Sequence, residues 1–286
     1  MKNILIPIDF SENSINALQY AKTLFSTEIC TFYLLNVYIT NPSNLLSEEY
    51  NNSVLTKMSY ESEKDLKLFL NKNSSENDNN NHRFESVFKV NTLVKAINSV
   101  VTSKKIDFII MGTKGANGAK EVFLGSNTVK VINRVENFPV LVVPQNYIPK
   151  KPSVITFSTN FKRSYIEKEL KPLINIAISN NSKVNIARIM MEEYLNDHQK
   201  VNKKTLKVFF KEIDYIFCKI DLESSQTNAI KNFVQQTKSD LIVLIHHKHN
   251  FFQKLLEEDV VEKISFNSSI PLLILPELKQ KSITNK

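Results

Sequence analysis

The same order of segments occurs twice along this chain of 286 residues. In each half, short apolar runs alternate with segments whose apolar residues recur at helical spacing, which is typical of βαβ units and a parallel sheet. The runs of the first half lie near residues 3–9, 30–38, 83–90, 107–112 and 138–144, and those of the second at 153–161, 182–191, 215–221, 239–245 and 269–276. We therefore expect two tandem copies of one α/β domain.

The spacing of matching residues supports a duplication. Asp240 follows Asp107 by 133 positions (240 − 107), and Pro276 follows Pro144 by 132 (276 − 144). A repeat period of this length indicates duplicated domains rather than a solenoid. We predict two tandem Rossmann-like domains, each an open five-stranded parallel sheet with helices on both faces. The predicted bounds are 1–148 for the first domain, 152–278 for the second and 279–286 for a tail.

Helices are predicted between the strands. One should begin after Ser11, a residue suited to cap it, and another should cover roughly 48–71. A later helix should begin near Ser126. The Asn/Ser-rich segment 71–82 is predicted to be a loop that is too polar to pack.

Composition excludes several classes of protein. Apolar residues make up 42% and charged residues 23%, as in soluble globular proteins, and no apolar run approaches the ~18 residues that span a bilayer. Pro7 and Asp9 interrupt the apolar N-terminus, which we interpret as a strand rather than a signal peptide. Cys30 and Cys218 are far apart and fit reduced thiols. We expect a cytoplasmic protein without a membrane segment.

The net charge of +8 admits an anionic partner. The lysines are nevertheless scattered through helical segments, for example Lys203, Lys204, Lys207 and Lys211, without a dense basic block. A solvated helix face explains this pattern better than a nucleic-acid surface.

Glycine is nearly absent except in one place. A chain of this length would ordinarily hold about 20 glycines at ~7% usage, but this one has four, all between Gly112 and Gly125. Glycine is needed where the backbone takes a positive φ or where another group approaches it closely. The segment leaves the carboxyl end of a predicted parallel strand and enters a helix, at the sheet edge where ligands of open α/β sheets bind.

This connection has the chemistry of a phosphate site. Gly112 and Gly115 would let the loop turn and expose its amides, and Gly125, Ser126 and Thr128 lie at the start of the next helix, where free N–H groups and the dipole attract an anion. The alternative is that these glycines only permit tight turns. The motif is neither a Walker loop nor the dinucleotide fingerprint, because no Gly-Lys-Ser/Thr occurs and the spacing differs.

The spacing Gly112-x2-Gly115-x9-Gly125-Ser126 resembles the signature of the ATP-binding universal stress proteins. The first strand ending at Asp9 and the closing run FPVLVVP are similar to that family too. The resemblance covers the first half and, in outline, the second. It implies an ATP site, with or without Mg²⁺, in a tandem universal stress protein.

The resemblance also assigns roles to residues. It places adenine near Pro7, Ile8 and Val37, and the ribose and any divalent metal near Asp9. Met111 and Lys114 would flank the nucleotide. The phosphates would meet Gly112, Gly115, Gly125, Ser126, Asn127 and Thr128.

The second half departs from this pattern. Its matching loop, IHHKHN at 245–250, has no glycine, and Asn160 replaces Asp9. We therefore predict that it binds no ATP in the family's manner. His246, His247 and His249 could form a metal site, but adjacent histidines usually diverge, and a polar loop in an inactive site is the preferred interpretation. The resemblance further implies that the closing strands of the two halves pair edge to edge, as an intramolecular pseudo-dimer, and a homodimer is a further possibility.

The expected function is that of an adenine-nucleotide-dependent regulator in stress response, with nucleotide binding rather than turnover. No Ser-His-Asp or Cys-His arrangement is evident, so no catalytic residue is assigned. A slow ATPase or nucleotide-dependent transferase is one alternative, since phosphoryl transfer rests largely on positioning. An interaction scaffold with an empty pocket is another.

Overall fold

The computed structural model describes residues 1–38, 48–113, 125–190, 194–221, 225–246 and 269–278. The first half contains the strands β1 (Lys2–Pro7), β2 (Cys30–Tyr38), β3 (His82–Val90), β4 (Phe108–Gly112) and β5 (Val140–Val143), with the helices α1 (Glu12–Leu24), α2 (Glu48–Ser75), α3 (Leu93–Ser103) and α4 (Ser126–Arg134). The second half contains β6 (Val154–Ser158), β7 (Lys183–Met190), β8 (Tyr215–Asp221), β9 (Leu241–His246) and β10 (Leu272–Pro276), with α5 (Glu167–Asn180), α6 (Asp197–Phe209) and α7 (Gln226–Gln236). The α/β alternation is as predicted.

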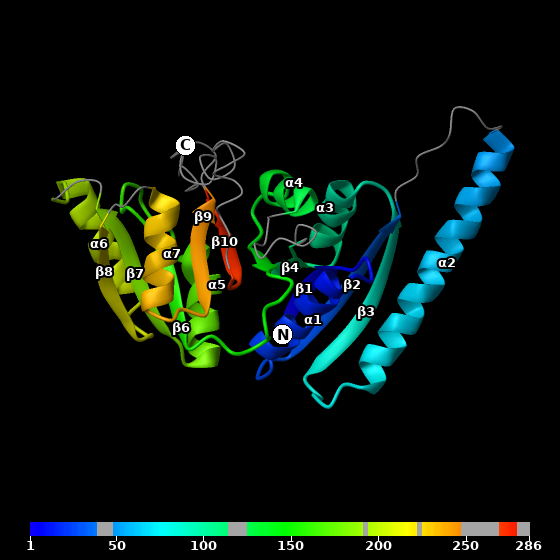
Figure 1. Ribbon diagram of the computed structural model, residues 1–286, viewed down its shortest axis with the longest axis horizontal. Coiled ribbons are helices and arrows are strands. Elements are labelled where there is room, and N and C mark those ends of the chain that lie inside the picture. The colour runs from blue at the N-terminus through cyan, green and yellow to red at the C-terminus, as the bar shows by residue number, and fades with distance from the viewer. Residues whose placement is uncertain (39–47, 114–124, 191–193, 222–224, 247–268, 279–286) are drawn as a thin grey trace, which may run out of the picture.

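The described strands form one sheet of ten, in the order β3-β2-β1-β4-β5-β10-β9-β6-β7-β8 (Figure 1). All neighbours within a half are parallel, and the order of the second half mirrors that of the first. β5 and β10 meet in antiparallel register, with Leu273 opposite Leu141. The predicted pairing of the closing strands is thus confirmed, and it covers two sheet edges that would otherwise be open.

Two apolar cores, one on each face of the sheet, cross the junction between the halves. Alternate residues of a strand point to opposite faces, so Leu141 and Leu273 join the core beneath α1 and α5, while Val142 and Leu272 join the core beneath α4 and α7. Each of these four residues is at most 2% exposed. Burial of such a side chain stabilises the fold by about 1.5–3 kcal/mol, so the junction contributes to both cores.

The connection from β5 to β6 is held by side chains of both halves. The Asn16 amide donates hydrogen bonds to the carbonyls of Pro144, Gln145 and Tyr147 at 3.0, 3.1 and 3.0 Å. The ring of Tyr147 packs edge-on against Tyr20, with a centroid distance of 5.4 Å. Asp240 pairs with Lys150 at 2.5 Å and accepts from the Ser153 backbone N–H at 2.8 Å. The predicted domain boundary falls in this connection.

Among the described residues other than glycine, positive φ angles recur at matching positions of the two halves. Phe10 and Phe161 have φ of 62° and 59°, and Lys105 and Lys238 have φ of 49° and 51°. Gly125, by contrast, has φ −59°. A positive φ is therefore not the reason for glycine at this position. The chain instead places ordinary side chains in the left-handed region, at a cost of roughly 1–2 kcal/mol each.

The segment 71–82 is not the unpacked loop that its composition predicts. α2 continues to Ser75, and His82 already belongs to β3. The Asn79 amide donates to the carbonyl of Ser26 at 2.8 Å, and the His82 ring lies 3.1 Å from the carbonyl of Phe25 through Nε2. Polar side chains pack here because they satisfy backbone groups of the neighbouring turn. No helix in the described part of the chain is long and apolar enough to cross a membrane.

Candidate functional site

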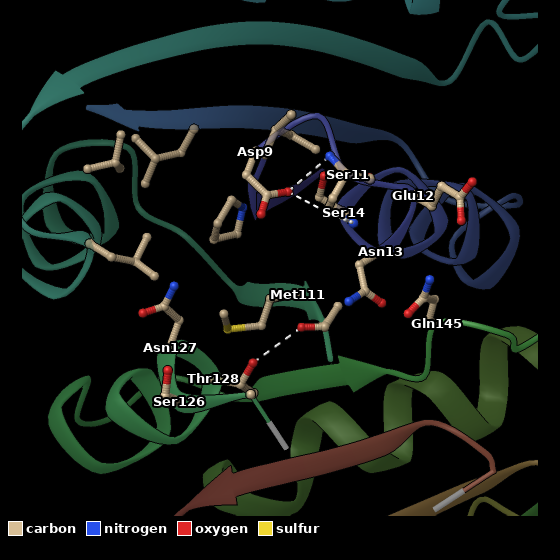
Figure 2. A pocket seen from close by; sticks show the side chains of 17 residues that line it. Asp9, Ser11, Glu12, Asn13, Ser14, Met111, Ser126, Asn127, Thr128 and Gln145 are labelled. Atoms are coloured by element: carbon tan, nitrogen blue, oxygen red, sulfur yellow. Dashed lines mark hydrogen bonds between the residues drawn. The ribbon is translucent and has the colours of Figure 1, made fainter. Parts of the chain in front are cut away.

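A cavity of about 540 Å³ opens at the carboxyl ends of β1, β2 and β4, between the N-termini of α1 and α4 (Figure 2). This volume lies in the range of pockets for small ligands. Ten of the twelve residues predicted to bind a cofactor line it. They are Pro7, Ile8, Asp9, Val37, Met111, Gly112, Gly125, Ser126, Asn127 and Thr128. The other two, Lys114 and Gly115, lie outside the described residues.

Asp9 forms the acidic wall of the cavity. Ser11 caps α1 as predicted, and its hydroxyl accepts from the Ser14 backbone N–H at 3.3 Å. One carboxylate oxygen of Asp9 accepts from the backbone N–H and the hydroxyl of Ser11, at 3.1 and 2.5 Å (Figure 2). Burial alone would raise the pKa of Asp9, but the hydrogen bonds from Ser11 and Ser14 outweigh it and the pKa is lowered. Asp9 is therefore a carboxylate at neutral pH.

Gly112 is glycine because α1 lies directly against it. A Cβ at this position would meet the backbone carbonyl of Asn13, with the oxygen at 2.5 Å and the carbon at 2.8 Å. Close approach of another group, one of the two reasons expected for glycine, thus applies at Gly112, and the group is the backbone of α1. The Thr128 hydroxyl donates to the Gly112 carbonyl at 3.2 Å. These contacts join the end of β4 to the first turns of α1 and α4.

The N-terminus of α4 faces Asp9 across the cavity (Figure 2). Its N-cap residue is Gly125, which offers no side-chain acceptor, and the first turn contains no acidic residue. Ser126 and Asn127 are exposed, while Thr128 is buried. A helix start with free N–H groups and added hydroxyl and amide donors is a suitable site for an anion.

An apolar wall completes the cavity. Five apolar residues line it, from the end of β1 and from β2, β4 and α3: Ile8, Leu35, Val37, Leu93 and Met111. Seven further residues line the cavity without having been predicted to bind a cofactor: Leu35, Leu93, Ser11, Glu12, Asn13, Ser14 and Gln145. One signal was available: a helix capped at Ser11, two residues after Asp9, must start at the same sheet edge. Leu93 and Gln145 carry no such signal, because only the fold brings them to the cavity.

The corresponding region of the second half is occupied by an ion pair. Arg163 and Glu277 stand at the positions of Glu12 and Gln145, counted from the paired Phe10/Phe161 and Pro144/Pro276. Arg163 forms salt bridges with Glu169, whose side chain is 0% exposed, and with Glu277 at 3.6 Å.

Side chains also fill the neighbouring positions of this region. Ile245 is the register equivalent of Gly112, since each lies opposite the last core residue of the closing strand. Asn160, in place of Asp9, accepts from the Lys162 backbone N–H at 2.9 Å. His246 ends β9, whereas His247 and His249 lie outside the described residues. No group of three or more metal-ligating side chains occurs among the residues that the structure describes.

Comparison with known proteins gives consistent matches. The universal stress protein family matches residues 1–144. The universal stress protein MJ0577 of Methanocaldococcus jannaschii is 32% identical over 153 residues, which is 50% of this chain and 94% of that protein. Among solved structures, a universal stress protein from Archaeoglobus fulgidus superposes with a TM-score of 0.67 at 15% identity, over 96% of both chains. A functionally unknown protein from Pseudomonas aeruginosa gives 0.58 at 12% identity, over 96% of this chain and 92% of the other. At 15% and 12% identity, these two solved structures show only that the fold is shared, and they do so over both halves of the chain.

Proposed function

Because the chain belongs to the universal stress protein family, we propose that the cavity of its first half binds an adenine nucleotide, with ATP as the preferred ligand. The observation that carries the proposal is the pairing of an apolar wall with an uncapped helix start. The wall of Ile8, Val37 and Met111 suits a flat base, and Ser126 and Asn127 at the start of α4 suit phosphates.

Asp9 is the residue that we expect to hold the ribose or a divalent cation. A carboxylate in a cavity that also takes phosphates repels them unless a hydroxyl donor or a cation lies between. Mg²⁺ prefers carboxylate and phosphate oxygens, so ATP should bind more tightly with Mg²⁺ present. Titration of ATP into the protein by calorimetry, with and without Mg²⁺, measures this difference.

Binding rather than turnover fits the chemistry of the cavity. An efficient general base has a pKa near the working pH, whereas the pKa of Asp9 is lowered by its hydrogen bonds. We therefore propose that the nucleotide acts as a regulatory ligand, recognised together with the protein surface around it by a partner in stress response. Multiple turnovers of ATP that are abolished by Asp9→Asn would instead establish a slow ATPase.

The second half is proposed to hold no nucleotide, because Arg163, Glu169 and Glu277 occupy the equivalent region. We expect one nucleotide per chain. Mass spectrometry of the small molecules released from freshly purified protein, together with calorimetric stoichiometry, tests both the ligand and the count. Two nucleotides per chain would contradict the proposal for the second half and leave that for the first intact.

Gly125→Val is the sharpest substitution for testing the first half. The backbone at Gly125, with φ −59° and ψ 148°, is one that valine adopts readily, so the variant should fold. Its side chain would stand at the start of α4, where phosphates are expected, and ATP binding should be lost. Gly115→Val should also abolish binding, and a double change of His246 and His247 to Ala should leave the affinity unchanged. A folded Gly125→Val variant that binds ATP normally would contradict the proposed site.

A further inference from the structure

Four positively charged residues gather at the outer end of the second half, where α6 packs beside β7 and β8 (Figure 1). Arg188 of β7 lies opposite Lys219 of β8 in the strand register. From α6, the ammonium groups of Lys203 and Lys207 lie 4.5 and 6.0 Å from the ring centroid of Phe217, which precedes Lys219 by two residues on β8. We call Arg188, Lys203, Lys207 and Lys219 the basic cluster.

The charges of the basic cluster repel one another. Burial lowers the pKa of Lys203, and the neighbouring charges of Lys207, Lys219 and Arg188 lower it further. Among the described residues, Lys203, Lys207 and Lys219 form no salt bridge, although Lys200 on the same helix pairs with Asp197 at 2.9 Å. Like charges directly opposite on paired strands are destabilising. An anion held between them would relieve that repulsion.

Arg188 and Lys203 of the basic cluster are also more buried, and make more contacts, than the side chains of a solvated helix face. The Arg188 side chain comes from a residue that is only 5% exposed, and it donates to the Met190 sulfur at 3.4 Å. A solvated helix face was predicted for the lysines of this helix, but Lys203 is half-buried over Phe217. Two ammonium groups that converge on one aromatic ring, beside a guanidinium and a further ammonium group on the adjoining strands, form a compact receptor for several negative charges.

We propose that the basic cluster binds a compact polyanion of the triphosphate type. Two ammonium groups around a single ring suit charges on neighbouring phosphate groups. The acidic side chains on one face of an extended peptide are instead about 7 Å apart. This site is independent of the cavity in the first half, because its residues lie on β7, β8 and α6 of the second half. The triphosphate could be inorganic or the tail of a nucleotide, and the experiment separates these sources.

The test uses calorimetric titration of inorganic tripolyphosphate into the full chain carrying Gly125→Val, which closes the first cavity. Lys203→Gln with Lys207→Gln should weaken binding by at least tenfold, since each charge-assisted hydrogen bond contributes about a factor of ten. Lys204→Gln with Lys211→Gln removes the same charge from α6 and the turn that follows it. This control should leave affinity within about twofold, because long-range contributions of exposed charges are screened. If Gly125→Val does not fold, Ser126→Asp replaces it by placing a carboxylate at the start of α4.

Titration of ATP into the same variant distinguishes the sources. Binding as tight as that of tripolyphosphate assigns the cluster to nucleotides, and much weaker binding assigns it to inorganic polyphosphate. The proposal is overturned if tripolyphosphate does not bind, or if the two double variants lose affinity equally. It is also overturned if a polyglutamate peptide binds as tightly as tripolyphosphate with the same dependence on Lys203 and Lys207.

Discussion

Replacement of Gly112 by alanine tests the account of how the cavity is assembled. The new methyl group would lie 2.5 Å from the Asn13 carbonyl oxygen and 2.8 Å from its carbon, both of them backbone atoms that cannot rotate away. Forcing an extra carbon into such a contact costs about 1–3 kcal/mol. Because the Gly112 backbone is not in the left-handed region, alanine also restricts the unfolded chain, which returns about 0.4–1 kcal/mol. We expect a net loss of about 1–2 kcal/mol in the free energy of unfolding.

Urea unfolding followed by circular dichroism measures this loss as a lower midpoint with an unchanged slope. Gly125→Ala is the matched control, since its backbone angles accept a side chain and its stability should change by less than about 0.5 kcal/mol. The added methyl group should also push α1 away from β4. This shift would displace Asn13 and Ser14, which line the cavity, and lower the affinity for ATP. A Gly112→Ala protein as stable as the wild type would refute the reasoning that close packing requires glycine here.

Three further outcomes are expected. Lys238→Gly should raise the free energy of unfolding by about 0.5 kcal/mol, because relief of the left-handed strain at φ 51° exceeds the entropy cost of glycine; a less stable variant in thermal unfolding would contradict this. Glu169→Gln should cost about 3 kcal/mol by leaving Arg163 without its buried partner, whereas Arg163→Met with Glu169→Met should recover most of it in urea unfolding. Asp9 should stabilise the fold above pH 3.8 and lose that contribution as the pH falls through its lowered pKa; wild type and Asp9→Asn should therefore converge in stability in acid, and a constant difference would argue against it.

Local patterns predicted the elements well and the contacts between them less well. The alternation of short apolar runs with segments of helical spacing located all ten strands of the described sheet, and Ser11 caps its helix as predicted. The error at 71–82 arose because polarity was taken to mean solvation, whereas Asn79 and His82 satisfy backbone groups of a distant turn. Such contacts depend on which turns the fold brings together, and no sequence window contains that information.

In the site, too, local features were predictable from the sequence and contacts between distant segments were not. The end of β4 and the start of α4 were predictable because parallel strands deliver their carboxyl ends to one edge of the sheet. Pro7, Ile8, Asp9 and Val37 were predicted through the resemblance to the universal stress proteins. The group that approaches Gly112 was not predictable, since the clash with Asn13 joins segments about 100 residues apart. The ion pair of Arg163 with Glu169 and Glu277 was likewise hidden. Its three members lie on separate segments and acquire a joint role only through burial.

The loss of glycine in the second half is coupled to where its first helix begins. α1 starts two residues after Phe10 (12 − 10), whereas α5 starts six residues after the equivalent Phe161 (167 − 161). The four extra residues amount to about one helical turn. We infer that this later start of α5 leaves room for the Ile245 side chain, whereas α1 lies directly against Gly112. Ile245→Gly would therefore not create a cavity like that of the first half. α5 would still lack the first turn that, in α1, forms one wall of the cavity. The left-handed residues Phe10 and Phe161 lie between a strand and the following helix, and Lys105 and Lys238 lie between a helix and the following strand. They recur in both halves because these connections, rather than the cavity, require them.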